Sequence, residues 1–385
     1  MMRAQQGIRA GALSAAVLCT TLTWGAAPAV AAESTRLGWE AQAISLPAAH
    51  KVTLGEGATV AVLDSGVNAD HPALKGRVQV GPSFYDEDGQ GPGDKDYGHH
   101  GTAMASDVLK IAPKAKVITA RVINDSKDEK LIRTKNGASP LALGIDWAVE
   151  QSADVISMSL GGGTFSDLED SETAAAARAV QKGVTLLAGA GNSADEGNEG
   201  NFPTGYATVI SVAATKPGGG HAEFSTVRTH NHIAAPGVDI VSARYEGGYK
   251  SIQGTSPATA IAAGVTALMV SENPDLTPAE VKKVLMQTAA HPAGGHDPLL
   301  GAGQVNAAAA VRAAKNPPKV DVSPKEYSGD KKTFGTPSGM SKVDHPEIEQ
   351  ELVTIGGGAA GVGLLMVIGG VLLFRRKKQG AGVVR

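Results

Sequence analysis

Four polar residues of complementary chemical types follow short apolar or glycine-rich stretches of the chain. Asp64 comes after the apolar run 59–63, and His100 leads into an alanine-rich stretch. Asn192 follows Gly-Ala-Gly, and Ser256 opens a long run of small residues. Together these residues supply an acid, a base, an amide donor for an oxyanion and a nucleophile. The set predicts nucleophilic catalysis.

The elements that must position these residues have the pattern of alternating strands and helices. Short runs that are apolar on both faces predict strands buried in a parallel sheet, which defines an α/β fold with right-handed crossovers. In such sheets the chemistry lies at the carboxyl ends of the strands. Thr277 and Glu280 form a capping-box pattern at one helix start. The predicted strands are 59–63, 117–122, 155–160, 184–188 and 209–213, and the predicted helices are 140–151, 171–182, 256–272, 278–288 and 304–314.

Taken in order, the motifs around the four residues resemble those of the subtilisin family of serine peptidases. Because motifs need a structural context, their order and number matter more than any single one. The resemblance covers about residues 38–312 and implies a subtilisin-like three-layer fold with a mostly parallel central sheet. The motifs are Asp-Ser-Gly at 64–66, His-Gly-Thr at 100–102, Gly-Asn at 191–192 and Gly-Thr-Ser at 254–256, with further likeness at 157–162, 235–237 and 301–306.

The resemblance implies a role for each residue. Ser256 would attack the scissile carbonyl, His100 would take the serine proton, and Asp64 would hold His100 in the right tautomer. The Asn192 side-chain amide and the backbone N–H of Ser256 would bind the oxyanion. The segment Ser159-Leu160-Gly161 would pair with an extended polypeptide substrate as an added strand.

Three positions depart from the family pattern. His99 stands where the family usually has glycine, and we interpret it as a loop residue, because adjacent side chains point apart and His100 is the one that precedes Gly-Thr. Pro257 removes no oxyanion donor but is expected to keep Ser256 out of the helical region. Ala260 replaces a common proline. We expect an active enzyme.

Apolar segments near both ends predict export and anchoring. Residues 1–32 carry Arg3 and Arg9 before a short apolar centre and close on small residues, as in a secretory signal peptide; the alternative is an uncleaved anchor. Residues 353–374 carry no charge over 22 positions and can span a membrane as one transmembrane helix. The basic tail 375–385 would stay cytoplasmic. The peptidase domain 33–315 would then lie outside the cell membrane on a flexible polar tether, 316–352.

Composition excludes several classes of protein. A net charge of −3 gives no electrostatic footprint for nucleic acid, and 49 glycines without a three-residue period exclude collagen. The single cysteine, Cys19, lies in the predicted signal peptide, so the chain cannot form an internal disulfide. We expect no cofactor. Structural calcium is common in the family, but the sequence does not place a site for it.

Two polar clusters outside the motifs have simpler interpretations. The run 230–232, His-Asn-His, is interpreted as a polar surface loop, since no carboxylate or cysteine stands at ligand spacing. Asp195, Glu196 and Glu199 are interpreted as a solvated loop. The alternative for these acids is that they border the substrate pocket and favour basic or polar residues there.

The order of signal peptide, peptidase domain, tether and anchor resembles the mycosins, membrane-bound peptidases associated with type VII secretion in actinobacteria. The segment 38–44 fits their start, and about 25 residues before the first strand leave no room for a folded pro-domain. Mycosins often have disulfides, which this chain cannot form.

Two functions stay open. One is an anchored serine endopeptidase that processes or supports type VII secretion. The other is a structural subunit of a membrane secretion complex, with proteolysis secondary.

Overall fold

The computed structural model describes residues 37–85, 89–125, 137–161, 168–200 and 202–322, together with Gly363, Met366, Ile368 and Gly369. The chain divides into two compact units, 1–322 and 323–385. The helices, strands and contacts below belong to the first unit. The predicted signal peptide and basic tail lie outside the described residues, as does nearly all of the tether.

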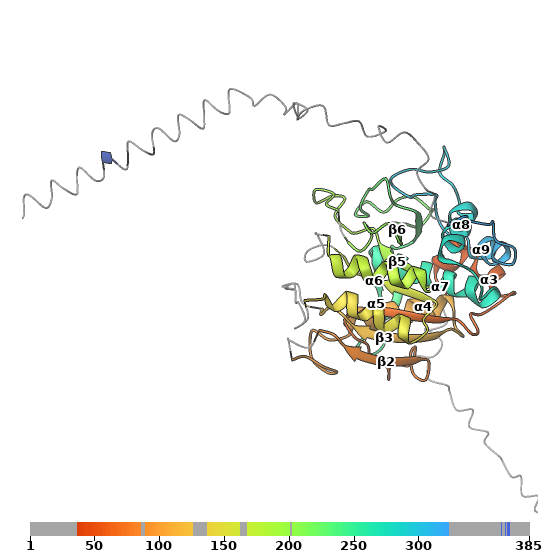
Figure 1. The fold of residues 1–385 in the computed structure, drawn as a ribbon, viewed down its shortest axis with the longest axis horizontal. Coiled ribbons are helices and arrows are strands. Elements are labelled where there is room, and N and C mark those ends of the chain that lie inside the picture. Colours follow the sequence, from red (N-terminus) through yellow and green to blue (C-terminus); the bar gives the residue numbers. More distant parts are fainter. Residues whose placement is uncertain are drawn as a thin grey trace, which may run out of the picture. The chain divides into compact units, whose positions relative to one another are not determined.

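A parallel sheet forms the centre of the first unit (Figure 1). Within the described residues it has seven strands in the order β2-β3-β1-β4-β5-β6-β7, and every neighbouring pair runs parallel. A separate antiparallel hairpin joins β8 and β9. The predicted α/β class with a mostly parallel sheet is confirmed. The strands are β1 (Thr59–Asp64), β2 (Val78–Ser83), β3 (Lys116–Arg121), β4 (Val155–Met158), β5 (Thr185–Gly189), β6 (Val209–Thr215), β7 (Ile233–Pro236), β8 (Ile240–Ala243) and β9 (Tyr249–Ile252).

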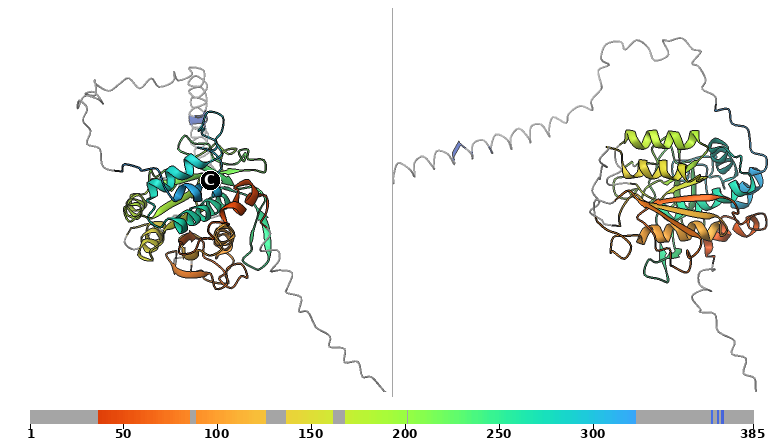
Figure 2. Two further views of the ribbon diagram at one scale, coloured as in Figure 1. Left: turned by 90° about the vertical axis from the view of Figure 1, so that its right-hand side faces the viewer. Right: turned by 60° about the horizontal axis from the view of Figure 1, so that its bottom comes forward.

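Helices cover both faces of this sheet and make a three-layer arrangement (Figure 2). The helices α4 and α7 pack together on one face, with α2, α3, α8 and α9 in the same core, and α5 and α6 share the core of the other face. Their bounds are α2 (Trp39–Ala43), α3 (Leu46–Ala49), α4 (His99–Ile111), α5 (Pro140–Glu150), α6 (Asp170–Gln181), α7 (Thr255–Glu272), α8 (Pro278–Thr288) and α9 (Ala307–Ala314).

Strand β1 shows why the sequence runs are apolar on both faces. Val60 and Val62 belong to the core on the α4 side, whereas Ala61 and Leu63 belong to the core on the α5 side. Because side chains alternate along a strand, only an uninterrupted apolar run fills both cores. The polar residue that follows this apolar run, Asp64, ends β1, so it lies where the carboxyl ends of the parallel strands meet.

Helix α7 is buried almost all round, so its sequence is made of small and apolar residues. A Cβ at Gly264 would lie 2.6 Å from the Cβ of Ile111, so α7 approaches α4 closely at this glycine. This packing fixes the relative position of the two helices whose first turns carry His100 and Ser256.

Most predicted elements agree with the structure within one or two residues, and the differences have local causes. The capping box of Thr277 and Glu280 is confirmed at the start of α8. The last predicted helix begins at Ala307 instead of residue 304, because the Asn306 side chain caps it. The strands β2, β7, β8 and β9 were not predicted. Strand β2 is largely exposed and contains Gly81 and Pro82, which weaken a strand signal.

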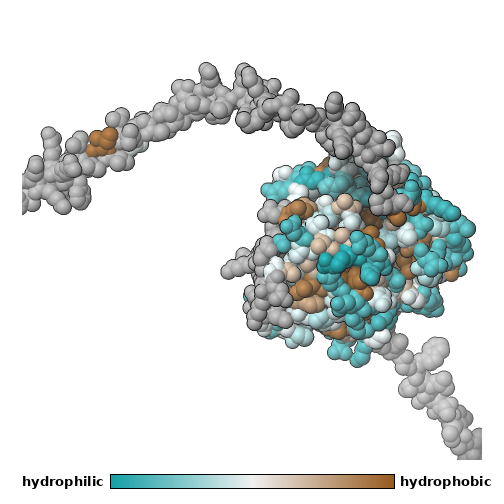
Figure 3. All heavy atoms as spheres, viewed as in Figure 1, coloured by the Kyte–Doolittle hydropathy of each residue, from teal (hydrophilic) through white to brown (hydrophobic). Residues whose placement is uncertain are grey.

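Across the described residues, no helix is long and apolar enough to cross a membrane. Of the predicted span 353–374, only the four residues named above are described, and all four are helical. On the face of the first unit shown in Figure 3, hydrophobic residues are scattered in small groups among hydrophilic ones. Scattered exposure of this kind is ordinary for a folded domain.

Candidate active site

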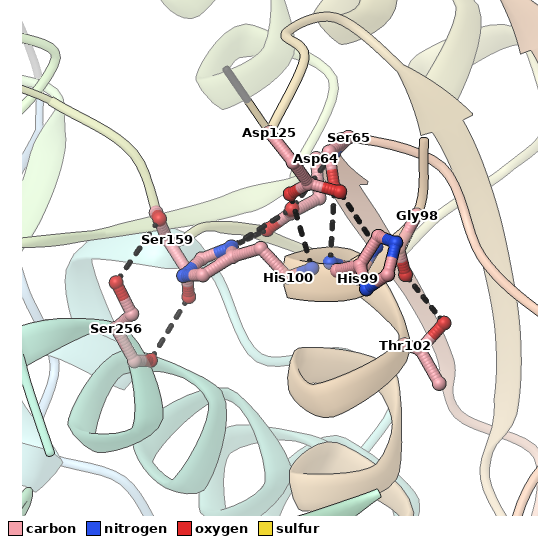
Figure 4. A network of polar contacts seen from close by, with 10 residues as sticks. Asp64, Ser65, Gly98, His99, His100, Thr102, Asp125, Ser159 and Ser256 are labelled. Atoms are coloured by element: carbon pink, nitrogen blue, oxygen red, sulfur yellow. Dashed lines mark hydrogen bonds and ion pairs between the residues drawn. The ribbon is translucent and has the colours of Figure 1, made fainter. Parts of the chain in front are cut away.

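Asp64, His100 and Ser256 come from three elements that meet at the carboxyl edge of the sheet (Figure 4). Asp64 is the last residue of β1, His100 is the second residue of α4, and Ser256 is the second residue of α7. Residues far apart in the chain are thus gathered where a doubly covered parallel sheet usually carries its chemistry.

The Asp64 carboxylate contacts the His100 ring through both of its oxygens. His100 Nδ1 lies 2.9 Å from Oδ1 and 3.0 Å from Oδ2. Asp64 is buried and also accepts the backbone N–H of Ser65 at 2.7 Å. A ring nitrogen that faces a carboxylate carries the hydrogen of the neutral imidazole, so the lone pair is left on Nε2. This arrangement fixes the tautomer that a general base needs.

The pKa of His100 is raised above its usual 6.5 by its surroundings. Burial by itself lowers this pKa, and the Lys250 ammonium lowers it further. The charge and hydrogen bonds of Asp64, with a smaller contribution from Asp125, outweigh both. The protonated ring is therefore stabilised, which makes neutral His100 a stronger base.

Close backbone packing holds the start of α4 against the end of β1. Gly98 precedes the helix with φ 77°, a left-handed conformation that favours glycine. A Cβ at Gly101 would overlap the carbonyl oxygen of Gly66, and the Gly101 N–H donates to Ser65 Oγ at 3.2 Å. The glycine of the His-Gly-Thr motif is thus required by the approach of the two segments.

Ser256 exchanges hydrogen bonds with Ser159, the residue that follows β4 by one position. Its Oγ donates to the Ser159 carbonyl oxygen at 3.2 Å, and Ser159 Oγ donates to the Ser256 carbonyl oxygen at 2.9 Å. Between the described side chains of His100 and Ser256 no hydrogen bond is formed, although the ring lies between Asp64 and the Ser159–Ser256 pair (Figure 4). Such bonds are often long without substrate and tighten when substrate binds.

The expected effect of Pro257 on Ser256 is wrong. Helix α7 begins at Thr255, one residue before the predicted start, so Ser256 lies inside the first helical turn. Pro257 is the third helical residue, where a backbone N–H would have no partner within the helix. The proline therefore removes no helical hydrogen bond, and the backbone N–H of Ser256 stays at the open end of the helix.

Asn192 is oriented by the first residue of α7. Its Oδ1 accepts the Thr255 N–H at 2.9 Å and the Thr255 hydroxyl at 3.1 Å, so Nδ2 is the atom left for other partners. A Cβ placed on Gly254 would lie 3.6 Å from the Ser256 nitrogen and 3.7 Å from Asn192 Nδ2. Two N–H donors therefore border one small space, which glycine keeps empty.

The predicted substrate segment follows β4 and is mostly buried. Ser159 and Leu160 are buried, whereas Gly161 is exposed with φ 147°. Strand β4 ends at Met158, two residues before the predicted end, so this segment continues beyond the sheet. Its pairing with a substrate stays a prediction.

The interpretation of His99 as a loop residue is wrong, since it is the first residue of α4. Its Nδ1 lies 3.1 Å from Glu246 Oε1, and its ring stacks on Tyr245 with centroids 4.9 Å apart. These partners draw the His99 ring away from Asp64. The two neighbouring histidines thus serve different contacts.

One residue of this site was missed by the sequence analysis. Asp125 Oδ2 accepts the backbone N–H of His99 at 2.6 Å, and Oδ1 accepts that of His100 at 3.1 Å. The sequence signal that could have indicated Asp125 was its position along the chain. It follows the end of β3 by four residues, and β3 is the strand beside β1. A carboxylate there lies at the same sheet edge as Asp64.

The other polar clusters differ partly from their interpretation. Asn231 is buried, accepts the Ser211 hydroxyl and donates to the carbonyls of Thr226 and Pro298, so its assignment to a surface loop is wrong. Among the residues that the structure describes, no group of three or more His, Cys, Asp or Glu side chains could hold a metal ion. The acidic residues Asp195, Glu196 and Glu199 are exposed.

Comparisons of the sequence and of the fold with known proteins find proteases. Residues 55–323 match the subtilase family, peptidase S8. A thermostable alkaline protease from Halalkalibacterium halodurans is 34% identical over 292 residues, which cover 72% of this chain and 74% of that protein. The serine protease MycP1, an essential component of the type VII (ESX-1) secretion system, superposes with a TM-score of 0.59 and 29% identity over 72% of this chain and 89% of that structure. The MycP3 protease from the type VII (ESX-3) secretion system superposes with a TM-score of 0.60 and 26% identity. The match covers 72% of this chain and 89% of that structure.

Proposed function

Since this chain belongs to the subtilase family of subtilisin-like serine endopeptidases, we propose that it hydrolyses peptide bonds through Ser256, His100 and Asp64. One observation carries this assignment. A buried carboxylate contacts His100 Nδ1 with both oxygens, while the other edge of the ring faces the start of α7, where Ser256 lies (Figure 4).

In the proposed reaction Ser256 Oγ attacks the scissile carbonyl carbon and its proton passes to His100 Nε2. Asp64 stabilises the imidazolium that forms. The oxygen of the tetrahedral intermediate takes hydrogen bonds from Asn192 Nδ2 and from the Ser256 N–H, in the field of the α7 N-terminus. His100 then gives its proton to the leaving amine. A water molecule, deprotonated by the same ring, hydrolyses the acyl-enzyme and restores the Ser256 hydroxyl.

The proposed substrate is an extended polypeptide bound along Ser159-Leu160-Gly161. The exchange of hydrogen bonds between Ser159 and Ser256 supports this placement, because it holds the backbone of the segment beside the nucleophile. A substrate strand paired there would bring its carbonyl to the space between Asn192 and Ser256.

Hydrolysis of a denatured protein by the purified protein tests the proposal. We expect cleavage by the wild type, none by Ser256→Ala, and wild-type cleavage by Ser251→Ala, which removes an exposed hydroxyl on β9. Cleavage by Ser256→Ala at the wild-type rate would overturn the assignment of the nucleophile.

The place of action that we propose is the outer face of the cell membrane. The signal-like segment 1–32 and the uncharged span 353–374 with its basic flank support it, and the likeness to MycP1 and MycP3 supports a link to type VII secretion. Cell fractionation tests it. The full chain should sediment with membranes, and a chain that ends at residue 352 should appear in the medium; a full chain found in the soluble cell fraction would contradict it.

A structural role in a membrane secretion complex is the second candidate, favoured by the likeness to a protease described as an essential component of such a system. Secretion assays in deletion and Ser256→Ala strains separate the two roles. Secretion that survives Ser256→Ala but fails in the deletion would support the structural role. Failure in both strains would assign the requirement to proteolysis.

A further inference from the structure

We propose that Asp125 is a positioning residue for His100. Its carboxylate holds the backbone N–H groups at the start of α4 and places a negative charge beside them. This inference rests on the proposed function of His100. It concerns a side chain that lies outside the Asp-Ser-Gly, His-Gly-Thr, Gly-Asn and Gly-Thr-Ser motifs.

Helix α4 has no capping side chain of its own. The residue before it is Gly98, whereas Ser139, Thr277 and Asn306 cap α5, α8 and α9 with their side chains. The first N–H groups of a helix have no intrahelical partner and need one from outside. In α4 the N–H groups of His99 and His100 both bond to Asp125.

Asp125 itself is held by the fold. Its backbone N–H donates to the Asp96 carbonyl oxygen at 3.1 Å, and it stands just beyond β3, whose Arg121 is in register with Asp64 of β1. The ends of two adjacent strands therefore approach one histidine. Asp64 contacts its ring, and Asp125 contacts its peptide nitrogen.

The charge of Asp125 matters because of where α4 begins. A helix N-terminus carries partial positive charge, which disfavours an imidazolium in the first turn. A carboxylate on the first two N–H groups offsets that field. The charged groups that act on His100 are Asp64 and Asp125, which are negative, and Lys250 of β9, which is positive. The neighbouring His99 instead stacks on Tyr245 and contacts Glu246.

A structural cap and a positioning residue differ in their effect on proton affinity. Replacing Asp125 by Asn keeps the size and one acceptor oxygen but removes the charge. The pKa of His100 should then fall, so the acid limb of kcat/KM should move to lower pH, with a loss of roughly threefold to thirtyfold at the plateau and little change in KM. Asp125→Glu, which restores the charge, should return the acid limb toward its wild-type position.

The experiment measures the pH profile of peptide hydrolysis and, separately, the NMR titration of the His100 ring in the Ser256→Ala background. Asp70→Asn, at an exposed side chain, is the matched control and should leave both unchanged. A lower His100 pKa in Asp125→Asn by NMR supports the proposal. A wild-type titration and acid limb, accompanied only by a lower melting temperature, would overturn it. The NMR arm needs no turnover, so its result is separate from a failure of the proposed peptidase activity.

Discussion

The Asn192 amide is turned by Thr255, the residue that precedes the proposed nucleophile, through bonds of 2.9 and 3.1 Å to its Oδ1. The same side chain that would bind the oxyanion is thus fixed to the helix that carries Ser256. The proposed donor and the proposed nucleophile are positioned by one helix start, which is the preorganisation that charge stabilisation requires.

This arrangement predicts the effect of Asn192→Asp, which keeps an acceptor for Thr255, removes the donor and adds a negative charge that repels the oxyanion. We expect kcat to fall by at least about 10²–10³ with KM nearly unchanged, because the oxyanion exists only in the transition state; a loss of this size is familiar from subtilisins that lack the donor alone. Steady-state kinetics check it. Thr255→Val, which removes one of the two orienting bonds, should cost less, and a wild-type kcat in Asn192→Asp would contradict the role.

The raised pKa of His100 predicts how activity depends on pH. The base must be neutral to accept a proton, so kcat/KM should fall as the pH drops through a value above 6.5. Asp64→Asn should lower kcat/KM by about 10⁴, as the loss of the aspartate does in serine peptidase triads, and move the residual acid limb to lower pH. A pH profile of both proteins checks this. An acid limb below pH 6.5 in the wild type would be inconsistent with the contact to Asp64.

The close packing of Gly101 against Gly66 predicts that a larger residue at position 101 would displace the neighbouring His100. Gly101→Ala would drive a Cβ into the Gly66 carbonyl oxygen and push α4 away from β1. We expect a loss of about 1–3 kcal/mol in the free energy of unfolding and a larger loss of activity, since His100 moves with the helix. Thermal unfolding and kinetics measure the two effects. Gly220→Ala is the control, because its Cβ would meet only the flexible Lys216 side chain at 3.6 Å; equal behaviour of the two variants would refute the steric account.

A buried charge cluster near the end of α4 predicts a pH-dependent stability. Lys110 Nζ lies 3.3 Å from both Asp107 Oδ1 and Glu40 Oε1, and burial raises the pKa of Asp107 to about 6. Lys110→Met leaves both acids without their cation, which typically costs about 3–5 kcal/mol. The loss should be smaller at pH 5 than at pH 8, because Asp107 is largely protonated at pH 5 even in the wild type.

The pH dependence of the wild-type protein's stability follows from the same pKa of Asp107. Folded Asp107 binds its proton more tightly than in the unfolded chain, so its contribution favours folding most at low pH and declines as the pH rises from about 4 to 6. Urea unfolding at pH 5 and pH 8 tests the difference. Lys114→Met, which breaks the exposed contact with Glu56, should cost less than about 1 kcal/mol at either pH. An equal loss for Lys110→Met at both pH values would count against the cluster.

The sequence carried strong signals for most buried elements, although it missed β7, whose four residues are all buried. Strand β1 and helix α8 were predictable because a doubly buried strand and a capped helix leave local patterns. The exposed strand β2 and the hairpin of β8 and β9 leave weaker patterns, so they were missed. The start of α7 was predicted one residue late, at Ser256 instead of Thr255.

The site shows the same division. Asp64, His100, Asn192 and Ser256 stand in motifs whose order is readable from the chain. Asp125 has no such motif, since its importance arises only when the end of β3 reaches the first turn of α4. His99 was misread for a similar reason. Its partners Glu246 and Tyr245 come from the connection between β8 and β9, which the sequence does not place beside α4.

Labelling with a fluorophosphonate tests the central claim, that His100 and Asp64 make Ser256 a nucleophile, most directly. The reaction forms a bond between Ser256 Oγ and phosphorus and releases fluoride, and peptide mapping by mass spectrometry locates the adduct. We predict a label on Ser256 in the wild type and in Ser251→Ala, a much slower label in His100→Ala, and none in Ser256→Ala. A folded wild-type protein that takes no label, or a Ser256→Ala protein labelled as fast as the wild type, would contradict the account.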